Sequence, residues 1–171
     1  MELMANQGTG TTAVAVYDAA VSKAGKATVS GNGSASTVTE LVEHIVSNGS
    51  SLAYIIRAEI EPKKTTFLTP SDLKQQVGFV VYPAGGEVRR HVHRSIERRL
   101  VGTSEVIIVR KGRCEIDVYD NDRILVATRE LFPGDIMLMT GGGHGFRMIE
   151  DTVLLEVKQG PYTGIDEKEH F

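Results

Sequence analysis

The chain has 171 residues, enough for a single domain that buries a sizeable hydrophobic core. Its formal net charge is −3 and 24% of its residues are charged, so the overall balance does not indicate nucleic acid or a membrane surface as a partner. A single cysteine, Cys114, excludes an intrachain disulfide, and its position in a strand-like run favours a thiol packed in the core.

The start of the chain lacks the basic region and apolar core of a signal peptide, and no apolar run approaches the ~20 residues that span a bilayer. We therefore expect a cytoplasmic protein. Residues 1–36 are unusual, because tracts rich in Gly, Ser and Thr at 8–12 and 30–36 have little to bury. The sequence predicts a flexible N-terminal extension over residues 1–36 and one folded domain over residues 37–171.

Residues 38–56 allow two structures. Between Val38 and Val46 apolar residues recur at helical spacing, which is typical of a short helix. The same stretch also fits a strand that Asn48-Gly49 joins to the apolar run at 52–56, because Asn-Gly favours a hairpin turn. The sequence leaves both structures open.

Beyond this point the pattern is that of β-strands. Short apolar runs, separated by Pro, Gly, Asn and Asp, are centred on residues 55, 80, 107, 116, 125, 138, 146 and 155. About eight short strands with no long helix between them predict an all-β sandwich or jelly roll.

The strongest chemical signal is the pair His91 and His93. On a β-strand, residues two apart share a face, so both imidazoles would aim at one point. Glu105 opens a second apolar run, and His144 follows a third in a glycine-lined turn. Imidazole nitrogens and a carboxylate are common ligands of first-row transition metals. We therefore predict a metal site built from His91, His93, Glu105 and His144.

A competing carboxylate, Glu97, lies four residues after His93. It is flanked by arginines and has no strand pattern around it. Glu105 begins a β-branched run, which makes it the better candidate ligand.

Two stretches resemble the conserved motifs of the cupin superfamily. The residues that carry the resemblance are Gly85, His91, His93, Glu105 and Gly112 in the first motif, and Gly134, Asp135 and His144 in the second. The resemblance covers about residues 50–160. It departs from the family in a long gap between His93 and Glu105, and in Met139 and Thr140 where the second motif has a proline.

The resemblance implies a cupin jelly-roll barrel, the double-stranded β-helix, that holds a divalent Fe, Mn, Ni or Zn ion. Four protein ligands leave positions open for a substrate or for O₂, and the metal can polarise a carbonyl as a Lewis acid. Residues 156–162 also resemble small cupins described as sugar-isomerase-like.

Two polar residues, Glu156 and Lys158, alternate within the apolar run 153–158. If this strand lines the barrel, both face one way, either as a general acid and base or as a structural ion pair. Burial raises the pKa of a Glu and lowers that of a Lys, which suits proton transfer. We take both as candidate catalytic residues.

Residues 89–99 contain five arginines, which suit phosphate or carboxylate ligands. Arg89 shares the parity of the two histidines, so Arg89 and Arg94 are predicted to contact an anionic substrate. The alternatives are a solvated loop, or ion pairs with the acidic residues at 166–169. No aromatic residues are interleaved as a nucleic-acid platform requires.

In the runs at 106–109 and 136–139, the residues on both faces of the expected strand are apolar. Strands of this kind are covered on both faces, so the outward faces of 106–108 and 136–139 predict a homodimer, unless the N-terminal segment covers them.

Three functions remain open. The first is a metal-dependent isomerase or epimerase that acts on a small polar or anionic carbonyl or sugar-type compound. The second is an iron-dependent dioxygenase that acts on a small organic acid. The third is a non-catalytic cupin that binds metal or a small ligand.

Overall fold

The computed structural model describes residues 41–162 and 164–171, so the predicted N-terminal extension lies outside the described residues. The described part contains ten strands and one short 3₁₀-helix, η1 (Gly164–Glu167). The strands are β1 (Val42–Ser47), β2 (Ser50–Ile56), β3 (Thr66–Phe67), β4 (Gly78–Phe79), β5 (Glu105–Lys111), β6 (Cys114–Tyr119), β7 (Leu125–Leu131), β8 (Ile136–Met139), β9 (Gly143–Met148) and β10 (Val153–Lys158). None of these elements is a helix with the length and apolarity needed to cross a bilayer. The all-β prediction is confirmed for this part of the chain.

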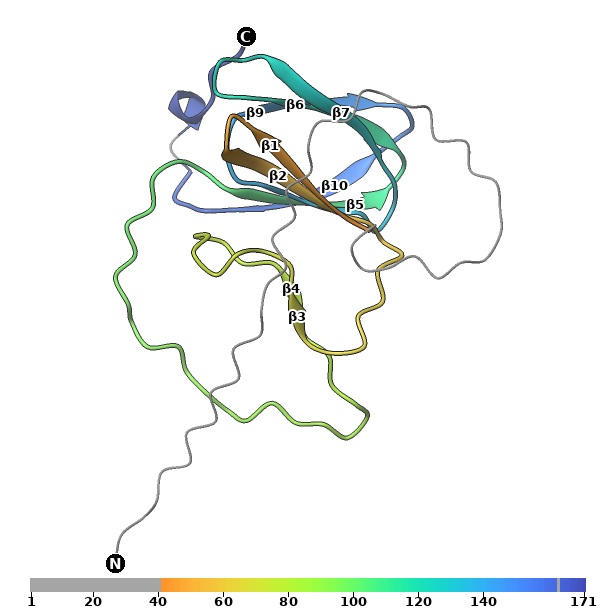
Figure 1. Cartoon of the computed structure of the whole chain (residues 1–171), viewed down its shortest axis with the longest axis vertical. Helices are drawn as coiled ribbons and strands as arrows, with labels where there is room; N and C mark the ends of the chain where they lie inside the picture. The colour runs from red at the N-terminus through yellow and green to blue at the C-terminus, as the bar shows by residue number, and fades with distance from the viewer. Residues whose placement is uncertain (1–40, 163) are drawn as a thin grey trace, which may run out of the picture.

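The strands form antiparallel sheets rather than a closed barrel. A five-stranded sheet has the order β1-β2-β8-β5-β10, a three-stranded sheet has the order β7-β6-β9, and β3 pairs with β4. Figure 1 shows the three-stranded sheet facing one side of the larger sheet and the β3–β4 pair on the other. At one side of the sandwich Arg129 of β7 binds the Glu43 carboxylate of β1, with Nη2 2.6 Å from Oε1. At the other side, the outer edges of β9 and β10 pair with no described strand.

For residues 41–56, the described part of the stretch that allows two structures, the structure has the hairpin. β1 and β2 pair in antiparallel register, and Asn48 and Gly49 form the turn between them. Both turn residues have positive φ, 49° and 76°, as a two-residue type I′ turn requires.

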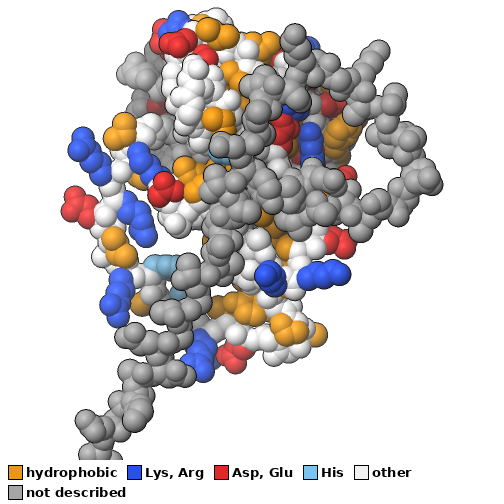
Figure 2. All heavy atoms as spheres, viewed as in Figure 1, with side chains coloured by type: hydrophobic (Ala, Val, Ile, Leu, Met, Phe, Trp, Pro, Cys, Tyr) orange, Lys and Arg blue, Asp and Glu red, His pale blue; other side chains and the backbone are white. Residues whose placement is uncertain are grey.

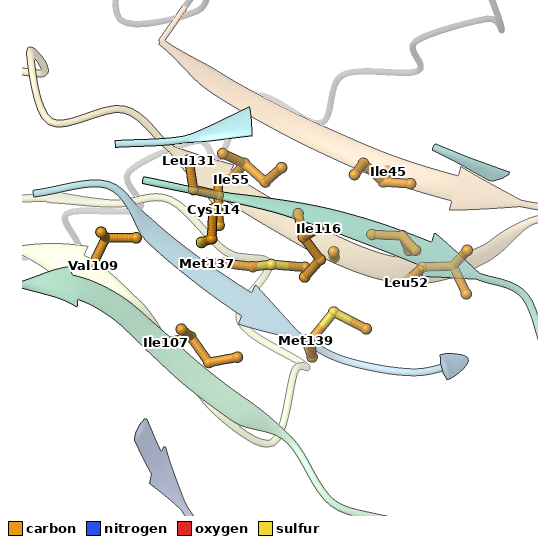
Figure 3. Close-up of a cluster of buried hydrophobic side chains, with 12 residues drawn as sticks. Ile45, Leu52, Ile55, Ile107, Val109, Cys114, Ile116, Leu131, Met137 and Met139 are labelled. Atoms are coloured by element: carbon orange, nitrogen blue, oxygen red, sulfur yellow. The ribbon is translucent and has the colours of Figure 1, made fainter. Parts of the chain in front are cut away.

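One hydrophobic core fills the space between the five-stranded and the three-stranded sheet (Figure 3). Alternate residues of each strand face it, as the two-residue period of a strand dictates. Its buried members are Ile45, Leu52, Ala53, Ile55, Ile107, Val109, Cys114, Ile116, Val118, Leu131, Met137 and Met139. The prediction of a packed Cys114 is confirmed, and burial raises the pKa of its thiol.

The opposite face of the five-stranded sheet is also largely buried. Leu138 and Ile56 are 0% exposed, although neither belongs to the core between the sheets. The β3–β4 pair lies on this side, and Asp72 in its connecting loop acts electrostatically on Tyr54. Burial is the main cause of the raised pKa of Tyr54. Leu138, on which the predicted dimer face depends, is therefore already buried within one chain, while Val106 and Ile108 are half-buried.

Asp135 fixes the end of the sandwich at the β7–β8 turn. Its buried carboxylate accepts a hydrogen bond from Arg57 at 2.7 Å, and others from the backbone N–H groups of Ala58 and Phe132 at 2.9 and 3.0 Å. The hydrogen bonds from Arg57 and Ala58 join the β7–β8 turn to the residues that follow β2, and the one from Phe132 lies within the turn.

Residues 80–104, which we call the histidine–arginine segment, contain no strand. They leave the end of β4 and loop away from the sheets before β5 begins (Figure 1). Val92 is 88% exposed and Ile96 is 63% exposed. The prediction that His91 and His93 lie on a strand is wrong for this structure, because a strand needs a neighbour for its backbone hydrogen bonds and this segment has none among the described residues.

Candidate functional site

A pocket of about 760 Å³ lies at the end of the sandwich where β5 begins and β8 ends. It is lined by Glu105 at the start of β5, the β6–β7 turn, the glycine-rich turn at 141–145, and residues 167–171. The glycine turn needs its glycines: Gly142 has φ of 66°, and a Cβ there would collide with the carbonyl oxygen of Tyr119.

Glu105 and His144 meet in this pocket from different sheets. Glu105 shares the inward face of β5 with Ile107, and His144 lies on β9 opposite the buried Val118 of β6. Their side chains approach to 3.3 Å between Nε2 of His144 and Oε2 of Glu105. Glu105 is 7% exposed, so the pair forms one polar spot at the edge of the hydrophobic core.

The surroundings of His144 favour its neutral imidazole. Burial lowers the pKa of His144 and the positive charge of Lys168 lowers it further, while the carboxylates of Glu105 and Glu156 act in the opposite direction. The net shift is downward. A neutral imidazole is the form that binds metals.

Glu156 and Lys158 lie on β10, the strand that pairs with β5, and are not among the residues that line the pocket. In the antiparallel register of β10 with β5, Lys158 lies opposite Glu105 and Glu156 lies opposite Ile107. Directly opposed residues point to the same face of a sheet, so both side chains share the inward face. Lys158 Nζ lies 3.3 Å from Glu156 Oε1 and 3.8 Å from an oxygen of Glu167.

The expected tuning of Lys158 is wrong in direction. Its pKa is raised, chiefly by the hydrogen bond to Glu156, and burial opposes that effect without overcoming it. Lys158 is therefore held as an ammonium group, which can donate a hydrogen bond or a proton and cannot act as a base.

His91 and His93 lie outside the pocket, in the exposed histidine–arginine segment. Their rings meet edge to face with centroids 5.2 Å apart, and His91 Nδ1 lies 2.8 Å from the carbonyl oxygen of Arg89. Within the described residues, no group of three or more His, Cys, Asp or Glu is arranged to hold a metal ion. The structure thus brings together Glu105 and His144 among the four predicted ligands. The rejected candidate, Glu97, is exposed in the same segment.

The arginines are likewise on the surface. Arg89 and Arg94 are exposed and do not line the pocket. Figure 2 shows basic side chains standing out along the limb at the left, where Figure 1 places this segment. No ion pair joins these arginines to another described side chain; the acidic Glu169 pairs with Arg123 instead, at 2.6 Å.

Residues 167–171 form one wall of the pocket, and the sequence patterns did not indicate this role. Phe171 packs edge to face on Tyr119 with ring centroids 5.2 Å apart, and Arg123 lies 5.4 Å from the centre of the Phe171 ring. Lys168 and His170 line the pocket between these contacts. The only sequence signals were an unassigned aromatic and a run of charges, which are typical of any solvated chain segment.

The fold and the pocket define an antiparallel β-sandwich protein with a polar pocket at one end of its core. A comparison of the chain with family models, with curated proteins and with solved structures finds no match. Its function is therefore argued from the chemistry of the pocket.

Proposed function

We propose that this chain is a metal-dependent enzyme of the cupin type that isomerises or epimerises a small polar or anionic carbonyl or sugar-type substrate. The observation that carries the proposal is the pair Glu105 and His144 in the pocket, with Glu156 and Lys158 on the inward face of the neighbouring strand β10. Two donors suited to a metal thus lie beside a proton donor and a second carboxylate.

The donor chemistry of Glu105 and His144 fits a divalent metal. An imidazole nitrogen and a carboxylate oxygen 3.3 Å apart offer two ligands of the kinds that Fe, Mn, Ni and Zn accept. When bound there, such an ion supplies a Lewis acid that polarises a carbonyl oxygen.

His91 and His93 are proposed as the remaining ligands, which reach the site when the histidine–arginine segment pairs with the edge of β9 that pairs with no described strand. β9 carries His144, so a strand added at that edge places its inward side chains beside this histidine. The twelve residue steps from His93 to Glu105 reach up to about 40 Å when extended, so the tether is long enough. Pairing also covers apolar side chains, such as Val92, that are exposed in the coil.

The chain's own residues then divide the proton chemistry. Glu156 has a side chain that is 41% exposed, and as a carboxylate it removes the proton from the carbon next to the carbonyl and returns it. Lys158 keeps its proton because its pKa is raised, and it donates a hydrogen bond to the substrate oxygen on which negative charge develops.

Limited trypsin digestion tests the metal site. In the metal-free protein we expect the first cuts within the histidine–arginine segment, because it carries five arginines in exposed coil. Added Zn²⁺, Ni²⁺ or Mn²⁺ should slow these cuts, because a paired strand is protected. Glu105→Gln and His144→Ala should abolish the protection, and Glu97→Gln should retain it. Equal protection in wild type and Glu105→Gln would overturn the site.

Proton exchange tests the reaction. Metal-loaded protein is incubated in D₂O with a panel of small aldoses, ketoses and hydroxy aldehydes, and deuterium on the carbon next to the carbonyl is followed by NMR. We expect exchange that Glu156→Gln abolishes and that proceeds without O₂. A reaction that requires iron and consumes O₂ would instead establish the dioxygenase alternative.

A further inference from the structure

The segment 167–171 is held against the pocket on both sides of Lys168. Glu167 lies 3.8 Å from Lys158, and Glu169 lies 2.6 Å from Arg123. Phe171 then packs on Tyr119 and lies against Gly143, where an added Cβ would be 3.0 Å from the Phe171 ring. These contacts fix the backbone around Lys168 while leaving its own side chain exposed at the pocket.

The acidic residues of the pocket are already engaged. Glu105 lies beside His144, and Glu169 binds Arg123. Asp120 accepts hydrogen bonds from two backbone N–H groups of its own turn, at 3.0 Å each, and from the hydroxyl of Ser47 at 3.2 Å. Glu167 lies near Lys158.

The cationic side chains of the pocket differ in whether they have an anionic partner. Arg123 is occupied by Glu169 and by the Phe171 ring. Lys168 makes no ion pair with any of the described side chains, and its exposed side chain lines the pocket. His170 lines the same wall. Lys168 is thus an ammonium group at the pocket with no anion assigned to it.

We propose that Lys168 recognises the anionic group, a phosphate or a carboxylate, of the ligand that binds beside Glu105 and His144. This inference rests on the proposed function, because it places the substrate in that same pocket, and it replaces Arg89 and Arg94 as the residues that select an anion. An ammonium group is a common phosphate-binding group, and a hydrogen bond between opposite charges is stronger than a neutral one.

The test is an NMR titration of the backbone amides of residues 141–145, in metal-free and in Zn²⁺-loaded protein. The probes are glycerol 3-phosphate, glycerate and glycerol, which share a skeleton and differ in charge. We expect saturable shifts with at least one of the two anions and none with glycerol at equal concentration. The stronger anion identifies the group that Lys168 prefers.

Variants connect the binding to Lys168. Lys168→Ala should weaken anion binding by about tenfold or more, as expected when one charge-assisted contact is lost. Lys168→Arg should retain most of the affinity. Lys111→Ala is the matched control, because it removes an exposed cation at the far end of β5 and should change nothing. Arg123→Ala should weaken binding to a smaller degree by releasing Glu169.

The outcomes separate this inference from the proposed function. Equal anion affinity in wild type and Lys168→Ala, equal binding of glycerol, or no anion binding in either metal state would overturn the role of Lys168. If the protein takes up no metal, the proposed function fails. A Lys168-dependent titration in metal-free protein would still establish the anion site.

Discussion

The predicted site is divided between two regions, the pocket end of the sandwich and the histidine–arginine segment. The first region is paired β-sheet, and the second is exposed coil. Glu105 and Lys158 are cross-strand neighbours in a paired sheet. His91 and His93 sit in exposed coil. Strand parity predicts one shared face for Glu156 and Lys158 and another for His91 and His93. β10 has this alternation, while His91 and His93 lie on no strand.

The difference shows what parity depends on. A side chain alternates reliably only where its backbone is paired, because the partner strand and the buried neighbours fix the register. Ile107 and Val109 bury the inward face of β5 and so force Glu105 inward. Val92, which lies between the two histidines, is 88% exposed, so its burial does not determine the face to which the histidines point.

The largest expected effect is a loss of stability in the sandwich, the paired region of this comparison. Asp135→Ala removes a buried carboxylate, which leaves two backbone N–H groups without their acceptor and leaves Arg57 without its ion-pair partner, although Arg57 still donates to the carbonyl oxygen of Glu130. We expect the free energy of unfolding to fall by about 3–5 kcal/mol in urea denaturation. Asp151→Ala, at an exposed position, should change it by less than about 0.5 kcal/mol. A loss below ~1 kcal/mol at Asp135 would mean that this network is not formed.

The next effect concerns the outer face of the large sheet. Leu138 is fully buried within one chain, so Leu138→Ala should cost about 3 kcal/mol. If this burial is intramolecular, the urea midpoint of the wild type should not depend on protein concentration. A midpoint that rises with concentration, together with a dimer in light scattering, would restore the predicted homodimer.

Much of the fold could be read from the sequence, because short apolar runs separated by turn residues correspond closely to β2 and β5–β10. The Asn48-Gly49 turn also has a specific local cause in its two positive φ angles. Within the site, the inward placement of Glu105, Glu156 and Lys158 follows from alternation. The wall at 167–171 could not be predicted, since Phe171 and Arg123 meet through tertiary packing that has no periodic signature.

The third prediction tests whether bound metal removes the difference between the two regions by bringing the histidine–arginine segment into the site. In metal-free protein the double variant His91→Ala/His93→Ala should unfold with the wild-type free energy within about 0.5 kcal/mol, since both side chains are exposed. Metal at ~100 times its Kd should stabilise the wild type by about 2.7 kcal/mol and the double variant by clearly less. Equal stabilisation of the two proteins would show that the segment never joins the site.

The smallest effect is a pH dependence that belongs to the pocket end alone. In metal-free protein the folded-state pKa of His144 lies below its ordinary value of about 6.5, mainly because of burial. The unfolded chain therefore binds more protons in the window between the two values. The contribution of His144 to stability is present above about pH 6.5 and is lost as the pH falls through the folded pKa.

NMR titration of the His144 ring measures whether each charged neighbour raises or lowers the pKa of this histidine. Lys168→Ala should raise the pKa, because a repelling cation is removed, and Glu105→Gln should lower it, because a stabilising carboxylate is removed. Shifts in the same direction for both variants would contradict the opposite electrostatic effects of Lys168 and Glu105 on His144.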